Sequence, residues 1–284
     1  MLKRFFDFIL FGNIYIAIGA VCQIQSTARQ LNFTDNLFSY SILTFFATLF
    51  IYNLQRVFYS EVKDVNLNSI RRKWIFSHPA SIKILTLTGF IGVSLTFFSN
   101  DYRILFYLSP LLILSLAYFI PAIKLRKSPW FKMFTLVSVW TMTTAVVPLI
   151  LNSSSNSALH LWQLILHTSL RFCFMMAICI PFDIRDIAID ASESVSTLPH
   201  LFGENKTRLL ALFFLLIYIV LIILEFTTKT ISLPSFIALL ISMSATLILI
   251  IFSNSKRSEY YFVAGIDGTM ILQGVLMIIC SMIK

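Results

Sequence analysis

Three aspartates with helical spacing stand at the end of an apolar stretch of this chain. Asp183, Asp186 and Asp190 occupy positions i, i+3 and i+7, so a helix places their carboxylates on one face. Three like charges repel one another, and a membrane boundary is a costly place for them unless a positive group compensates. Because Mg²⁺ in proteins combines a few carboxylates with substrate phosphates, the spacing predicts a magnesium site that binds a diphosphate. The alternative is a solvated helix end that Arg185 partly neutralises.

The composition is that of a membrane protein. Of the 284 residues, 58% are hydrophobic and only 12% are charged, whereas soluble domains carry about 25% charged residues. A soluble fold is therefore excluded. The four cysteines lie in apolar stretches without metal-ligand spacing, so neither a disulfide framework nor a zinc site is predicted.

Stretches nearly free of charge recur along the chain, each close to the ~20 residues that a helix needs to cross hydrocarbon. They predict an all-α integral membrane protein of about nine transmembrane helices, forming a single domain over residues 1–284. Two longer polar loops are expected near 58–83 and 183–208. The nine stretches cover residues 8–24, 37–55, 84–99, 104–123, 133–151, 158–182, 209–224, 230–253 and 260–283.

Lysine and arginine residues are distributed unevenly between alternate loops. If the N-terminus is cytoplasmic, most of them fall on that side, and the opposite side keeps only Arg29, Arg103, Lys229 and Lys284. Cytoplasmic loops of membrane proteins carry such an excess, so the N-terminus and both long loops are predicted to be cytoplasmic, in a bacterial inner membrane. The same asymmetry explains the formal net charge of +9 without any nucleic acid partner.

The segment from Asp183 to Gly203 resembles the second aspartate-rich motif of the UbiA superfamily of intramembrane prenyltransferases. In that motif an Asn/Asp-x-x-Asp-x-x-x-Asp cluster precedes a Thr-Leu-Pro stretch that ends in Leu-x-Gly. Here Asp183, Asp186 and Asp190 match the cluster, and the run from Thr197 to Gly203 matches the stretch. The resemblance implies a nine-helix UbiA-like bundle in which the three aspartates are catalytic and bind Mg²⁺.

Further segments extend the resemblance. Tyr118-Phe-Ile-Pro121, followed by Lys124 and Arg126, is similar to the segment after the fourth helix that helps to hold the diphosphate. Asn13 stands where members often have a polar pocket residue, although a lone asparagine in a membrane helix also serves as an interhelical contact. The resemblance implies a substrate-binding set made of Asn13, Asn53, Arg56, Tyr118, Lys124 and Arg126.

The first motif of the superfamily is degenerate in this chain. If its asparagine is aligned on Asn53, two expected aspartates become Leu54 and Val57, and Glu61 is the remaining carboxylate that the resemblance assigns to the metal. Arg56 lies inside the motif and could bind phosphate oxygens through parallel N–H bonds without a metal. The alternative for Arg56 is an interfacial arginine that extends its side chain toward water.

Two charged residues fall deep within apolar stretches. Arg171 and Asp267 are predicted to pair with each other, because charges at such depth face a cavity, pair, or line a substrate path. A direct role in substrate binding is the alternative.

The resemblance implies a Mg²⁺-assisted prenyltransferase that acts on an isoprenyl diphosphate and a lipophilic or aromatic acceptor within membrane lipid. The alternative is a non-catalytic UbiA-like protein that binds a lipid or a partner protein, which the loss of carboxylates at Leu54 and Val57 favours. A transporter is less well supported, because the acidic cluster lies at a helix end and not at the membrane midplane.

Overall fold

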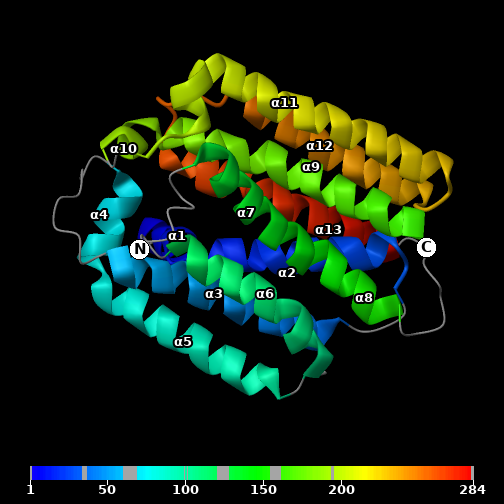
Figure 1. The fold of residues 1–284 in the computed structure, drawn as a ribbon, viewed down its shortest axis with the longest axis horizontal. Coiled ribbons are helices and arrows are strands. Elements are labelled where there is room, and N and C mark those ends of the chain that lie inside the picture. The colour runs from blue at the N-terminus through cyan, green and yellow to red at the C-terminus, as the bar shows by residue number, and fades with distance from the viewer. Residues whose placement is uncertain are drawn as a thin grey trace.

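The computed structural model describes residues 2–33, 37–59, 69–98, 100, 102–119, 128–153, 161–192 and 195–282. Every regular element in these ranges is helical (Figure 1). The α-helices are α1 (Leu2–Phe11), α2 (Ile14–Gln30), α3 (Phe38–Tyr59), α4 (Ile70–Ser77), α5 (Pro79–Phe97), α6 (Tyr102–Phe119), α7 (Pro129–Thr141), α8 (Val147–Ser153), α9 (Leu161–Arg185), α10 (Ile187–Ser192), α11 (Leu198–Thr227), α12 (Leu233–Ile251) and α13 (Gly268–Met282). Two π-helical turns, Met142–Val146 and Tyr261–Ile266, join α7 to α8 and precede α13.

The prediction of an all-α, multi-pass integral membrane protein is confirmed. Within the described ranges, seven helices are long and apolar enough to cross a membrane, and α1 with α2, bent by 61°, makes an eighth if the pair is one span. Each of the nine predicted stretches overlaps a helix. The count of nine spans is not confirmed, because the apolar part of α6, Phe106–Ser115, is shorter than a span.

The core forms around α9, which packs against α7, α11 and α12. Figure 1 shows α11 and α12 along one edge of the bundle and α3 and α5 along the other, with α2, α9 and α13 between them. Without a hydrophobic driving force between helices in lipid, such packing depends on close approach. Gly274 of α13 provides it, because a Cβ there would lie 2.4 Å from the carbonyl oxygen of Cys22 on α2.

Both predicted polar loops contain helices. α4 lies within 58–83, and α5 begins at Pro79, so this loop is shorter than expected. The loop at 183–208 contains α10 and the start of α11, whose helical path breaks at Gly203 (φ 78°, ψ 162°), a conformation that glycine adopts readily. α4 and α10 lie at the same end of the bundle (Figure 1), the charged end of the molecule.

Candidate functional site

The three aspartates stand where α9 ends at the charged end. Asp183 lies on the last turn of α9, Asp186 lies in the one-residue break before α10, and Asp190 lies on α10. The helical path continues through the break, since the amide of Asp190 donates to the carbonyl oxygen of Asp186 at 2.8 Å. Asp183 and Asp190 are each 2% exposed. The cluster is therefore buried, unlike a solvated helix end.

Lys132, on the first turn of α7, joins two of the carboxylates. Its Nζ donates to Asp183 Oδ1 at 2.7 Å and lies 3.6 Å from Asp190 Oδ2. Both carboxylates thus face one ammonium group, which agrees with their i and i+7 positions on one face of the helix. The sequence does not identify Lys132 as a site residue. It is 51 positions from Asp183, so no local spacing pattern connects the two.

Asp186 has a different set of cations. Arg185 Nε and Nη2 donate to its two oxygens at 2.7 and 2.6 Å, and Arg71 Nη2 lies 3.8 Å from Oδ1. Burial raises the pKa of Asp186, but the charges of Arg185, Arg71 and Lys132 outweigh this and hold that pKa well below its usual range. Asp186 is therefore ionised at neutral pH, and the three aspartates divide between two groups of cations.

Arg56 adds a third guanidinium near Asp186. It lies on the last turn of α3, and it interacts electrostatically with Arg71, Arg185 and Asp186. Arg71 begins α4, whose N-terminus is held by Glu259: this carboxylate accepts from the Ser69 hydroxyl and, at 2.6 Å, from the amide of Arg71. The end of α3, the start of α4 and the end of α9 thus bring three arginines together.

The first-motif positions Leu54 and Val57 point elsewhere. They line a groove of about 350 Å³ between α3 and α5, together with Phe50, Lys83, Thr86, Leu87 and Phe90. At about 100° per residue, Leu54 is rotated by about 160° and Val57 by about 100° from Arg56, so neither shares the direction in which Arg56 approaches Asp186. The alignment that places two expected aspartates at Leu54 and Val57 therefore selects side chains that line this groove and do not share the direction of Arg56.

Asn13 and Asn53 meet between α2 and α3. Asn13 Nδ2 donates to Asn53 Oδ1 at 3.0 Å, and Asn53 Nδ2 donates to the carbonyl oxygens of Gly12 and Leu49 at 3.0 and 2.9 Å. Both residues are buried. The side chain of Asn53 is thus engaged with Asn13, Gly12 and Leu49 of its own helix, and Asn13 makes the interhelical contact that was considered as its alternative role.

The side chains of four predicted site residues are not among those that the structure describes. Glu61, Lys124 and Arg126 lie outside the described residues, and Tyr118 lies on α6 with its side chain outside them. Their roles stay predictions.

The predicted pair of Arg171 and Asp267 is wrong. Arg171 is fully buried and donates to Gln273 Oε1 at 3.1 Å, Thr27 Oγ1 at 3.0 Å and the carbonyl oxygen of Gln23 at 3.2 Å. Asp267 instead interacts electrostatically with Arg185 and Arg71 at the charged end. Arg171 and Arg185 are about 21 Å apart along α9 at ~1.5 Å per residue, so the antiparallel course of the helices separates the expected partners.

The environment of Arg171 is a polar network inside the bundle. His167 Nδ1 lies 3.0 Å from Glu225 Oε1, and its Nε2 lies 3.3 Å from the Thr27 hydroxyl that also accepts from Arg171. All four side chains are buried. Their mutual bonds stabilise the contact of α9 with α2 and α11, since an unpaired polar group in the interior is costly.

The described carboxylates do not fit a resident metal ion. Asp183 Oδ2 is buried without a hydrogen-bond partner, as a metal ligand can be, but Lys132 stands between Asp183 and Asp190 and two arginines engage Asp186. Among the residues that the structure describes, no three His, Cys, Asp or Glu side chains are grouped to hold a metal. A divalent cation at the predicted place would have to displace the Lys132 ammonium.

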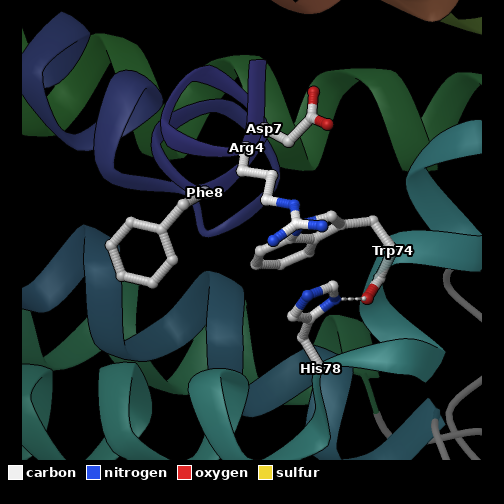
Figure 2. A pocket seen from close by; sticks show the side chains of 5 residues that line it. All are labelled: Arg4, Asp7, Phe8, Trp74 and His78. Carbon is white, nitrogen blue, oxygen red and sulfur yellow. Dashed lines mark hydrogen bonds between the residues drawn. The ribbon is translucent and has the colours of Figure 1, made fainter. Parts of the chain in front are cut away.

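A pocket of about 370 Å³ lies between α1 and α4 (Figure 2). Figure 2 shows the Arg4 side chain extending toward Trp74 and His78, whereas the Asp7 carboxylate points away from these rings. The His78 ring stacks on the Trp74 indole at 4.7 Å, and Asp7 accepts a 2.6 Å hydrogen bond from the Tyr260 hydroxyl. None of the three aspartates lines this pocket, so it is separate from the candidate site.

The architecture matches two solved structures along the whole chain. One is a structure of digeranylgeranylglyceryl phosphate synthase, with a TM-score of 0.55, 15% identity and coverage of 100% of both chains. The other is the apo structure of a UbiA homolog from Aeropyrum pernix K1, with a TM-score of 0.57, 15% identity and coverage of 96% of each chain. The chain has the UbiA fold.

No family model matches the sequence, and comparison with curated proteins gives no match. The UbiA fold of this chain is thus recognised through its architecture, and the predicted UbiA-like bundle is confirmed. Within that fold the arginines and Lys132 surround the second aspartate motif at the charged end.

Proposed function

We propose that this protein is a membrane prenyltransferase that transfers an isoprenyl group from an isoprenyl diphosphate to a lipophilic or aromatic acceptor. The observation that carries the proposal is the cluster of Asp183, Asp186 and Asp190 with basic side chains from three other segments, at one end of a UbiA fold. One structural neighbour is a digeranylgeranylglyceryl phosphate synthase, which supports an isoprenoid substrate.

The reaction requires cleavage of the bond between the isoprenyl carbon and the diphosphate oxygen. The electron pair leaves with the diphosphate, an allylic cation remains, and an acceptor nucleophile bonds to that carbon and releases a proton. Preorganised cations stabilise the charge that develops on the leaving group. In this proposal Asp183 and Asp190 orient Lys132, Asp186 orients Arg185 and Arg71, and the apolar bundle keeps water from the allylic cation.

The charged end is proposed to face the cytoplasm, with the N-terminus on the same side, in a bacterial inner membrane. The excess of lysine and arginine in the loops of that end supports this orientation. An isoprenyl diphosphate made in the cytoplasm would then reach the cluster directly, while its chain and the acceptor enter from the lipid.

A non-catalytic protein that binds a lipid or a partner protein is the second candidate. It is favoured by the end of α3, which presents the arginine Arg56, and not a carboxylate, to Asp186. This candidate predicts binding of an isoprenoid or another lipid without transfer.

Purified protein in lipid nanodiscs, supplied with radiolabelled isoprenyl diphosphates of several chain lengths and a lipid extract, tests the proposal. We expect diphosphate release and transfer of label to a lipid product, with Asp186→Asn lowering the rate by about a hundredfold or more. Asp7→Asn is the matched control, since Asp7 lies in the separate pocket. Binding of the isoprenyl diphosphate without transfer to any lipid would favour the second candidate instead.

A further inference from the structure

We propose that Arg56, Arg71 and Arg185 form a guanidinium clamp that binds the diphosphate directly and takes the place of a divalent cation at the first motif. The inference rests on the proposed function and adds to it the means by which the diphosphate is held. It concerns residues that the resemblance does not assign to metal binding, and it follows from the misfit between the described carboxylates and a resident metal.

The three arginines converge from helices that are distant in sequence. Arg56 lies on the last turn of α3, Arg71 on the first turn of α4, and Arg185 is the last residue of α9. Asp186 is the carboxylate that they share: Arg185 binds it through two nitrogens at 2.6 and 2.7 Å, Arg71 lies 3.8 Å away, and Arg56 contributes through its charge. Three like charges around one carboxylate leave an attraction for a further anion.

Each guanidinium also keeps a hydrogen-bonding group without a partner. Arg56 Nε, Arg71 Nε and Arg185 Nη1 are buried and make no hydrogen bond among the described residues. The Arg185 side chain is only 7% exposed, so water does not satisfy this group readily. A buried N–H without a partner is costly, and phosphate oxygens, which accept two parallel bonds from a guanidinium, suit these groups.

The other charged groups around the clamp are largely engaged in contacts within the protein. Glu259 accepts from the Ser69 hydroxyl and the amide of Arg71, and it contributes to the field at both Arg71 and Arg185. Asp267 acts on Arg185 and Arg71 only through its field, and Arg72 adds a positive charge. Burial and the charge of Arg185 lower the pKa of Arg71 to about 10, so Arg71 remains charged at neutral pH.

At the second motif, Lys132 supplies the positive charge that a metal ion would otherwise provide. Lys132 stands between Asp183 and Asp190, so these carboxylates orient a protein ammonium group beside the clamp. Arginine is suited to bidentate phosphate recognition and lysine acts as a point charge. The clamp and Lys132 together thus supply positive charge to the diphosphate from the chain itself.

The test is calorimetric titration of the purified protein in nanodiscs with an unreactive isoprenyl thiolodiphosphate. Each titration is performed once with Mg²⁺ and once with EDTA. The comparison of wild-type binding with Mg²⁺ and with EDTA uses no variant, so it tests the proposal even if a variant fails to fold. Arg56→Gln and Arg71→Gln remove one guanidinium each, Arg56→Lys keeps the charge but loses the planar fork, and Arg257→Gln removes an exposed arginine outside the clamp.

We expect binding in EDTA, weakened about tenfold or more by Arg56→Gln and Arg71→Gln, less by Arg56→Lys, and unchanged by Arg257→Gln. Binding with Mg²⁺ that disappears in EDTA would overturn the clamp and leave the proposed function in place. Absence of binding under both conditions would overturn the proposed function together with the clamp.

Discussion

Lys132 on α7 places its ammonium nitrogen 2.7 Å from Asp183 and 3.6 Å from Asp190, so one lysine compensates two buried carboxylates that are seven residues apart. Its side chain is 13% exposed, and the side chains of the two aspartates are 3% exposed. Removal of one partner of a buried ion pair leaves the other partner uncompensated, which is more costly than removal of both.

Lys132→Ala is therefore expected to destabilise the protein by roughly 3–5 kcal/mol, because it strands two buried carboxylates. Lys256→Ala, at an exposed lysine of the same end, should change stability by about 0.5 kcal/mol or less. Thermal unfolding in detergent measures both. The combined change Lys132→Met and Asp183→Asn should recover part of the loss, and a double variant as unstable as the sum of the single ones would contradict the pairing.

The pKa of Asp186 predicts a stability change in acid. Its folded pKa lies below the unfolded value of about 3.9, so its contribution is present above that value and is lost as pH falls below it. Asp186→Asn should be less stable than the wild type near neutral pH, and the two should converge as pH falls below about 4. Melting temperatures across this pH range give the difference. A gap independent of pH would show that the Asp186 charge is not what stabilises the wild type.

Arg171 should couple energetically to Gln273 and not to Asp267. Arg171→Ala and Gln273→Ala remove the two ends of one 3.1 Å hydrogen bond, so their effects should differ from additivity by about 0.5–3 kcal/mol. Arg171→Ala and Asp267→Ala should be additive within about 0.5 kcal/mol. Double-mutant cycles by thermal unfolding test both pairs, and strong coupling of Arg171 to Asp267 would contradict the structure.

Aspartates introduced at Leu54 and Val57 should not restore a metal site. Leu54→Asp and Val57→Asp place carboxylates in the apolar groove against α5, so we expect lower stability and unchanged Mg²⁺ affinity. Arg56→Asp, on the face that meets Asp186, should instead create a Mg²⁺ dependence of diphosphate binding. Titration of the thiolodiphosphate at several Mg²⁺ concentrations separates these outcomes. A higher Mg²⁺ affinity in Leu54→Asp would show that Leu54, and not Arg56, lies on the side of α3 that meets the aspartates.

The proposed orientation predicts that Lys256 is cytoplasmic and Lys229 external. In a background without native cysteines, Lys256→Cys should react with an impermeant thiol reagent only after the cells are opened, and Lys229→Cys should react in intact cells. The opposite pattern would invert the protein in the membrane and remove the cytoplasmic access proposed for the substrate.

The sequence by itself determined the fold class and the position of the acidic motif. Hydropathy is a local property, since a span must be apolar along its own length, so the helices α9 and α13 could be predicted from their own residues. The spacing of the aspartates is equally local: it predicts one face for all three, and in the structure Asp183 and Asp190 share Lys132 whereas Asp186 meets arginines.

Only the tertiary structure decided which cation fills that site and which face of α3 meets it. Lys132, Arg56 and Arg71 reach the aspartates through the packing of α7, α3 and α4, which no spacing along the chain encodes. For the same reason, Arg171 donates a hydrogen bond to Gln273 and does not pair with Asp267. Contacts between charged groups depend on the direction and depth of separate helices, and these are set when the helices pack.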